Sequence, residues 1–168
     1  MLFRSGWSDE DDPHKMPSHF FHSAWELDCE GAVRANIDAQ NYSVHPRFWY
    51  IDAWQNCIQC GSAFVFTIAE QQFWYEELRF WVGSYPTRCK ACRRSQRALL
   101  EAKQRYGELR EQAIRRDAPN ELKIEVIGLL DQIESAGEQL PERMRECRDV
   151  LCKQIVAMDS DDADPNAD

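Results

Sequence analysis

Two Cys-x-x-Cys pairs constrain this chain more than any other feature. The first pair is Cys57 and Cys60, directly followed by Gly61, and the second is Cys89 and Cys92. A Cys-x-x-Cys turn directs both thiolates at one ion, and two such turns complete a tetrahedral site with no open position. Four cysteine ligands in closed coordination are typical of structural zinc. We therefore predict one structural Zn2+ on these four cysteines.

Three further cysteines lie outside these pairs, at Cys29, Cys147 and Cys152. Cys147 and Cys152 are separated by about 140° around a helix, so they do not converge on one ion. Cys147 lies on an apolar helical stripe, and we expect it to be a buried core thiol. The pattern assigns no role to Cys29.

The N-terminus favours an intracellular protein. Its first residues soon meet the acidic run of residues 9–12, which lacks the basic-then-apolar order of a secretion signal. No stretch approaches the roughly 18 consecutive apolar residues of a membrane-spanning helix. We expect a cytoplasmic location and no membrane partner. Thiols stay reduced there, and paired cysteines more often bind metal than form disulfides.

The region around the cysteines predicts a β-hairpin and a helix. Residues 44–54 and 62–67 are rich in strand formers, and the first pair lies between them with Gly61 supplying a positive φ. Thr67 and Glu70 form a capping box that begins a helix. Five apolar residues then cover one broad helical face, which we expect to pack on the hairpin: Phe73, Trp74, Tyr75, Leu78 and Trp81.

Aromatic residues concentrate in residues 48–85, and two interpretations remain open. Large rings can fill the core of a small domain, which we favour, or they can form a stacking surface for RNA or single-stranded DNA.

The second half of the chain carries three apolar stripes at helical spacing. They are Leu99, Ala102, Tyr106, Leu109 and Ala113; Leu122, Val126, Leu129, Leu130 and Ile133; and Met144, Cys147, Leu151, Ile155 and Met158. Each stripe has to be buried, so we predict a helical hairpin or three-helix extension, folded within one chain or shared in a dimer.

These elements together predict an α+β protein built around a small four-cysteine zinc ribbon. We expect a disordered acidic arm over residues 1–23, a strand region and zinc ribbon over 24–94, a helical extension over 95–158 and a disordered acidic tail over 159–168. The arm contains His14, His19 and His22, which are either a second metal site or, as we favour, part of a solvated segment.

Three motifs in this order resemble a known family. They are Cys57-x-x-Cys60-Gly61; Phe64-Val65-Phe66-Thr67-x-x-Glu70-Gln71-Gln72-Phe73-Trp74-Tyr75; and Arg88-Cys89-x-x-Cys92-Arg93. The combination resembles the zinc-ribbon family labelled Tbcl-type and covers about residues 51–94. The resemblance implies that the four cysteines bind zinc. It implies no particular activity.

Charge is distributed unevenly along the chain. The formal net charge is -9, yet residues 88–116 are strongly basic. Candidate nucleic-acid-binding residues in that segment are Arg88, Lys90, Arg93, Arg94, Arg97, Lys103, Arg105 and Arg110. Alternatively, those near the cysteines offset the thiolate charge and the others face acidic segments of the same chain.

The sequence gives little support for catalysis. It contains no Gly-rich phosphate loop, His-Glu-x-x-His motif or nucleophile elbow, so we expect neither an enzyme nor a small-molecule substrate. The preferred hypothesis is a non-enzymatic interaction or adaptor module whose helices bind another protein or a second copy. The alternatives are a DNA- or RNA-binding protein and an acidic inhibitor or immunity-type protein for a basic partner.

Overall fold

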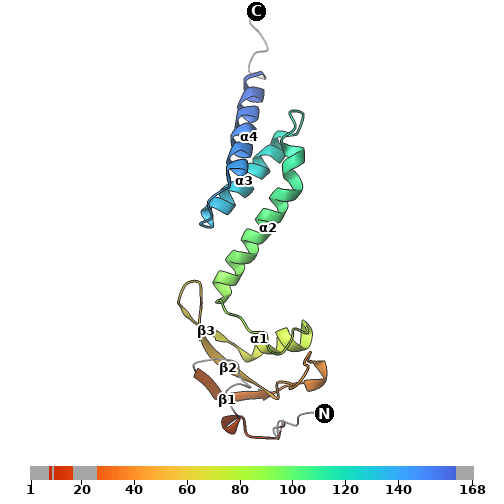
Figure 1. Ribbon diagram of the computed structural model, residues 1–168, viewed down its shortest axis with the longest axis vertical. Coiled ribbons are helices and arrows are strands. Elements are labelled where there is room, and N and C mark those ends of the chain that lie inside the picture. Colours follow the sequence, from red (N-terminus) through yellow and green to blue (C-terminus); the bar gives the residue numbers. More distant parts are fainter. Residues whose placement is uncertain (1–7, 9, 17–25, 162–168) are drawn as a thin grey trace, which may run out of the picture. The chain divides into compact units, whose positions relative to one another are not determined.

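The computed structural model describes Ser8, residues 10–16 and residues 26–161. The chain divides into two compact units, Met1–Cys92 and Arg93–Asp168, called here the N-terminal and C-terminal units (Figure 1). The N-terminal unit combines a small sheet with short helical segments, and the C-terminal unit is helical. The predicted α+β class is confirmed. No described helix is long and apolar enough to cross a membrane.

The sheet of the N-terminal unit has three antiparallel strands in the order β1-β2-β3. They are β1 (Glu26–Arg34), β2 (Trp49–Asn56) and β3 (Ala63–Phe66). Ala53 in the central strand lies opposite Leu27 of β1 and Phe66 of β3. The β1–β2 register shifts between Asp28 and Val33, so the pairing of this edge strand is irregular there.

Helix α1 (Ile68–Gln72) begins where the capping box predicts. The Thr67 hydroxyl accepts a hydrogen bond from the Glu70 N–H at 3.3 Å. A second and shorter bond comes from the sheet, because Asp52 Oδ1 accepts from the Ile68 N–H at 2.7 Å. The buried Gln71 amide donates to the carbonyl oxygens of Ile51 and Phe66, at 2.6 and 2.8 Å. These contacts fix α1 on the sheet.

The chain after α1 differs from the predicted single helix. Phe73–Glu77 form a π-helical turn, η4. The predicted burial of the whole apolar face is wrong: Tyr75 is fully buried, whereas Phe73, Leu78 and Trp81 are exposed. The π turn widens the spacing, so residues that share one face of an α-helix point in different directions.

Tyr75 is fully buried in the core of the N-terminal unit. It lies between Tyr50, stacked at 6.0 Å between ring centroids, and Phe66, edge-on at 6.2 Å. Its hydroxyl donates to the Ser84 carbonyl oxygen. This cluster confirms that large rings form a core here, as small domains require.

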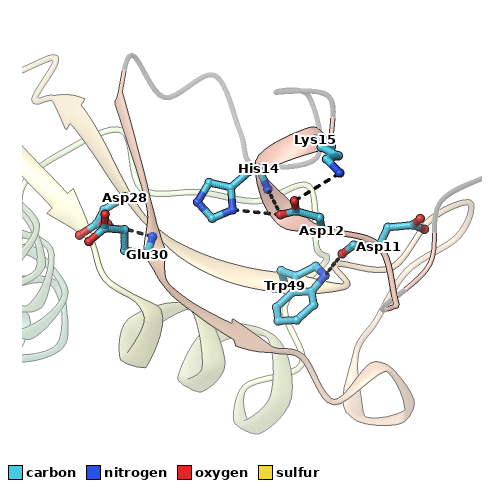
Figure 2. A network of polar contacts seen from close by, with 7 residues as sticks. All are labelled: Asp11, Asp12, His14, Lys15, Asp28, Glu30 and Trp49. Atoms are coloured by element: carbon cyan, nitrogen blue, oxygen red, sulfur yellow. Dashed lines mark hydrogen bonds and ion pairs between the residues drawn. The ribbon is translucent and has the colours of Figure 1, made fainter.

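Part of the N-terminal arm packs on the sheet, in contrast to the predicted disorder of residues 1–23. Met16 is buried against Ile51, and Trp49 Nε1 donates to the Asp11 carbonyl oxygen at 3.1 Å (Figure 2). The short 3-10 helix η1 (Pro13–Lys15) lies between Asp11 and Met16. It is capped by Asp12, whose carboxylate accepts a hydrogen bond from the His14 N–H at 3.0 Å. Burial of Met16 and the indole bond offset the entropy of ordering this segment.

The Asp12 carboxylate also contacts the His14 ring at 3.0 Å and the Lys15 ammonium at 3.8 Å (Figure 2). Among the three histidines considered for a second metal site, only His14 lies within the described residues. It is engaged with Asp12.

The C-terminal unit contains three helices: α2 (Lys90–Ala113), whose first three residues belong to the N-terminal unit, α3 (Asn120–Ser135) and α4 (Glu142–Asp161). All three predicted stripes supply their shared core, which includes Tyr106, Val126, Leu130, Cys147 and Leu151. The prediction of Cys147 as a buried core thiol is confirmed. Helix α3 is followed by Gly137 at φ 88°, and α4 extends to Asp161, three residues into the predicted disordered tail. Residues 162–168 lie outside the described residues.

Candidate metal centre

Four cysteines from two separate segments meet at one point of the N-terminal unit. Cys57 follows β2, Cys60 precedes β3, Cys89 precedes α2, and Cys92 lies in the first turn of α2. All four Sγ atoms lie within 4.8 Å of one another. The Sγ atoms of Cys60 and Cys89, which come from different pairs, are 3.9 Å apart. The structure therefore brings together the four residues singled out in the sequence.

The cluster has the dimensions of a tetrahedral metal site. A Zn–S bond of about 2.3 Å in tetrahedral geometry places neighbouring sulfurs about 3.8 Å apart. The 3.9 Å separation of Cys60 and Cys89 agrees with this value. Four thiols are also soft ligands, which select zinc over hard cations such as magnesium or calcium. The residues present thus fit one four-coordinate ion.

Backbone hydrogen bonds hold the first cysteine pair in place. The Gly61 N–H donates to the Cys57 carbonyl oxygen, and the Cys57 N–H donates to the Ser62 carbonyl oxygen, both at 2.9 Å. Gly61 has φ 72°, which confirms the predicted positive φ. The Ile58 N–H donates to the Thr87 carbonyl oxygen at 3.0 Å. That bond joins the first turn to the segment that leads into the second pair.

The second cysteine pair differs from the hairpin-like turn of a zinc ribbon. Helix α2 begins at Lys90, so Cys89 immediately precedes the helix and Cys92 lies on its first turn. The N-terminus of a helix presents unbonded N–H groups and a partial positive charge, which stabilise thiolates nearby. This site joins a hairpin to a helix start rather than two hairpins.

Local hydrogen bonds favour ionisation of the first pair. Burial raises the pKa of Cys57, but backbone N–H groups of Cys89, Cys60 and Gln59 outweigh it and lower that pKa to about 6. Hydrogen bonds from Ser62, chiefly from its hydroxyl, lower the pKa of Cys60.

Cys92 shows the opposite effect. Its hydrogen bond with Cys89 raises its pKa to about 12. Four adjacent thiols cannot all lose their protons unless a cation compensates the accumulated negative charge.

The basic residues proposed for nucleic acid do not share one role. Lys103 pairs with Glu138, and Arg105 pairs with Glu125 at 2.9 Å and Glu108 at 3.7 Å. These two cations therefore face acidic groups of the same chain, the alternative left open by the sequence. Arg110 is half-buried in the C-terminal unit.

The other five basic residues lie within residues 88–97, around the second cysteine pair. They are Arg88, Lys90, Arg93, Arg94 and Arg97. The Nε atoms of Arg88 and Arg93 are buried, whereas Lys90, Arg94 and Arg97 are exposed. Four of them, Arg88, Lys90, Arg93 and Arg94, flank the second cysteine pair in the sequence, where cations can offset the charge of a four-thiolate cluster.

Residues 51–99 match the model of a family described as "Probable treble clef domain". The match begins in β2, includes both cysteine pairs and ends within α2. The treble clef domain is a zinc-binding fold. Comparisons with curated proteins and with solved structures gave no match. Residues 51–99 are therefore similar to a probable treble clef domain, and the four cysteines of this segment lie together in the structure.

Proposed function

We propose that Cys57, Cys60, Cys89 and Cys92 bind one structural Zn2+, and that the protein is a non-enzymatic cytoplasmic interaction module. The observation that carries the metal proposal is the convergence of four Sγ atoms within 4.8 Å. Bound zinc would cross-link the β2–β3 hairpin to the start of α2. For zinc-finger peptides the apparent binding free energy is about 10–16 kcal/mol, which is folding free energy.

The donor set supports a structural role rather than catalysis. All four donors are cysteine thiols, so a tetrahedral ion has no position left for water or a substrate. Cys57 is buried, and the turn that carries it is fixed by backbone bonds to Ser62 and Thr87. Such a site maintains geometry and does not perform a reaction.

Exposed apolar side chains support the interaction role. In the segment from η4 to Trp81, the side chains of Phe73 and Trp81 are 52% and 55% exposed, and those of Leu78 and Phe80 are also exposed. Ile58, inside the first cysteine pair, is 68% exposed. Large exposed apolar and aromatic groups are typical of protein interfaces and unfavourable in water without a partner.

A second candidate function is nucleic-acid binding. The observation that favours it is the density of positive charge within residues 88–97. Against it, Lys103 and Arg105 are paired with carboxylates, so the basic stretch does not extend as one free face along α2.

Two double variants separate these functions. Arg94→Glu with Arg97→Glu should abolish binding to labelled RNA or DNA, and that binding should weaken steeply with salt if phosphates are the target. Phe73→Ala with Trp81→Ala should instead weaken binding to a protein partner identified by native mass spectrometry, with little salt dependence. A double variant with Arg116→Glu and Arg145→Glu makes the same charge change at exposed positions outside residues 88–97 and serves as the charge control.

Loss of partner binding in the aromatic variant, with the arginine variant unaffected, supports the interaction module. Salt-sensitive nucleic-acid binding that the arginine variant alone removes contradicts it. Zinc content and circular dichroism of each variant show that the fold is retained.

A further inference from the structure

Ion pairs connect neighbouring helices at two places in the C-terminal unit. Between α2 and α3, Arg105 pairs with Glu125 at 2.9 Å. Between α3 and α4, Arg148 pairs with Glu134 at 2.8 Å and with Asp131 at 3.4 Å. Charged side chains at these boundaries therefore find their partners within the chain.

The boundary between α2 and α4 is open. It contains a groove of about 320 Å³, with Tyr106 and Cys147 among its lining residues. Two charged residues of α2, Arg110 and Glu111, and two of α4, Arg143 and Glu146, also line it. Among the residues that the structure describes, none of these four forms an ion pair.

The same groove exposes apolar side chains. Ile114, directly after α2, is 46% exposed, and Val150 of α4 is 39% exposed, whereas Tyr106 and Cys147 are buried. The α4 residues that line it recur at three and four positions, so they form one helical face. The Gln154 side-chain amide of α4 also donates to the Ile114 carbonyl oxygen at 3.2 Å.

The charge of the groove favours an occupant that itself carries both signs of charge. The whole chain carries -9, but the four charged groove residues are two arginines and two glutamates and sum to zero. A strongly basic or acidic partner would gain no net attraction from this arrangement. A two-fold interface instead requires a surface that is complementary to itself. A helix face carrying both signs meets that requirement, because each arginine of one copy can face a glutamate of the other.

We propose that the α2–α4 groove is a self-association surface on which two copies pack groove to groove. Ile114 and Val150 form the apolar centre of this interface, and Arg110, Glu111, Arg143 and Glu146 form its charged border. The two copies would cover each other's exposed helix faces and build a four-helix contact from α2 and α4. This inference rests on the proposed interaction function and names its partner as a second copy of this chain.

Charge-swapped variants of the full chain test the proposal. The acidic-groove variant carries Arg110→Glu and Arg143→Glu, and the basic-groove variant carries Glu111→Arg and Glu146→Arg. Light scattering on a sizing column gives the mass over about 1 µM to 1 mM protein. The wild type should dimerise, and each variant alone should show a dissociation constant raised at least about tenfold by like-charge repulsion.

Mixing the two variants provides the decisive step. An equimolar mixture should restore dimers, and native mass spectrometry should identify them as heterodimers, because acidic and basic grooves now face each other. A double variant with Arg116→Glu and Arg145→Glu makes the same charge change as the acidic-groove variant outside the groove lining, and it should dimerise normally. Circular dichroism confirms that each variant keeps its helices.

The possible failures have different meanings. A wild-type protein that stays monomeric over the whole range, or variants that dimerise unchanged, overturns this proposal. If such a monomer still binds another protein through its exposed aromatic residues, the proposed interaction function stands without the dimer. If it binds nucleic acid in a salt-sensitive way instead, the proposed function fails as well.

Discussion

The N-terminus of α1 should depend more on Asp52 than on Thr67, although only Thr67 is evident from the sequence. The Thr67 hydroxyl accepts from Glu70 N–H at 3.3 Å, which is long for a hydrogen bond. Asp52, on the central strand, accepts from Ile68 N–H at 2.7 Å. This second bond also joins the helix to the sheet.

Asp52→Ala should lower the free energy of unfolding several times more than Thr67→Ala does. A hydrogen bond to a charged group contributes about 1.5–3 kcal/mol, and Asp52 is half-buried, so Asp52→Ala should destabilise the N-terminal unit by about 2 kcal/mol. The long Thr67 bond places Thr67→Ala near the lower limit for caps, at about 0.5 kcal/mol. Asp52→Asn keeps an oxygen acceptor and should cost roughly 1 kcal/mol or less.

Tryptophan fluorescence isolates the relevant unit. All six tryptophans precede Arg93, so their emission reports on the N-terminal unit alone. In thermal unfolding at fixed excess zinc, a loss of about 2 kcal/mol should lower the Tm by roughly 8–16 °C in a unit of this size. If Thr67→Ala lowers the Tm more than Asp52→Ala does, or if Asp52→Ala has no effect, the assignment of this cap is wrong.

Three further predictions concern the core, the first cysteine turn and the pH response. Leu130→Ala should destabilise the C-terminal unit by about 2–5 kcal/mol, because Leu130 is fully buried; helical circular dichroism against urea measures this. Gly61→Ala should cost about 1–2 kcal/mol through its φ of 72° alone, since the added Cβ meets no atom within 4 Å; an unchanged fluorescence midpoint would contradict this. Local hydrogen bonds lower the pKa of Cys57 to about 6, so a proton competes with zinc for this thiolate as the pH falls through about 6. Competition with a chromogenic zinc chelator should therefore show a zinc affinity that decreases over this range, and an affinity that does not change as the pH is lowered through about 6 would refute it.

Local patterns predicted the parts of the fold that depend on neighbouring residues. The first Cys-x-x-Cys turn needs only two intervening residues and Gly61, and the capping box spans Thr67 to Glu70. The apolar stripes fix which helix faces are buried, including that of Cys147. In each case the physical requirement lies within a few residues of the chain, so one sequence is sufficient.

Long-range contacts account for what the sequence did not predict. The π turn at η4 carries Tyr75, which packs between Tyr50 and Phe66, and helical periodicity in the sequence does not indicate this contact. Asp52 contacts Ile68 sixteen residues away, and the partner of Arg105 is twenty residues away at Glu125. A charged residue in a sequence does not indicate which opposite charge it will meet.

The order of residues 10–16 has the same cause. An acidic segment with a proline is typical of a solvated arm, yet Met16 finds a buried position beside Ile51. Trp49 and Asp11, thirty-eight residues apart, then form the hydrogen bond that fixes the segment (Figure 2). The composition of a segment does not show which single residues will form such contacts, so it could not predict that this segment is ordered.

The most direct test of the central claim is the zinc content of protein purified without added metal. Elemental analysis combined with native mass spectrometry should give one zinc per chain for the wild type. The Cys57→Ser variant should lose zinc and unfold its N-terminal unit at lower temperature. Folded wild-type protein without zinc, or a Cys57→Ser protein with full zinc content and an unchanged melting curve, would contradict the assignment of these four cysteines as a structural zinc site.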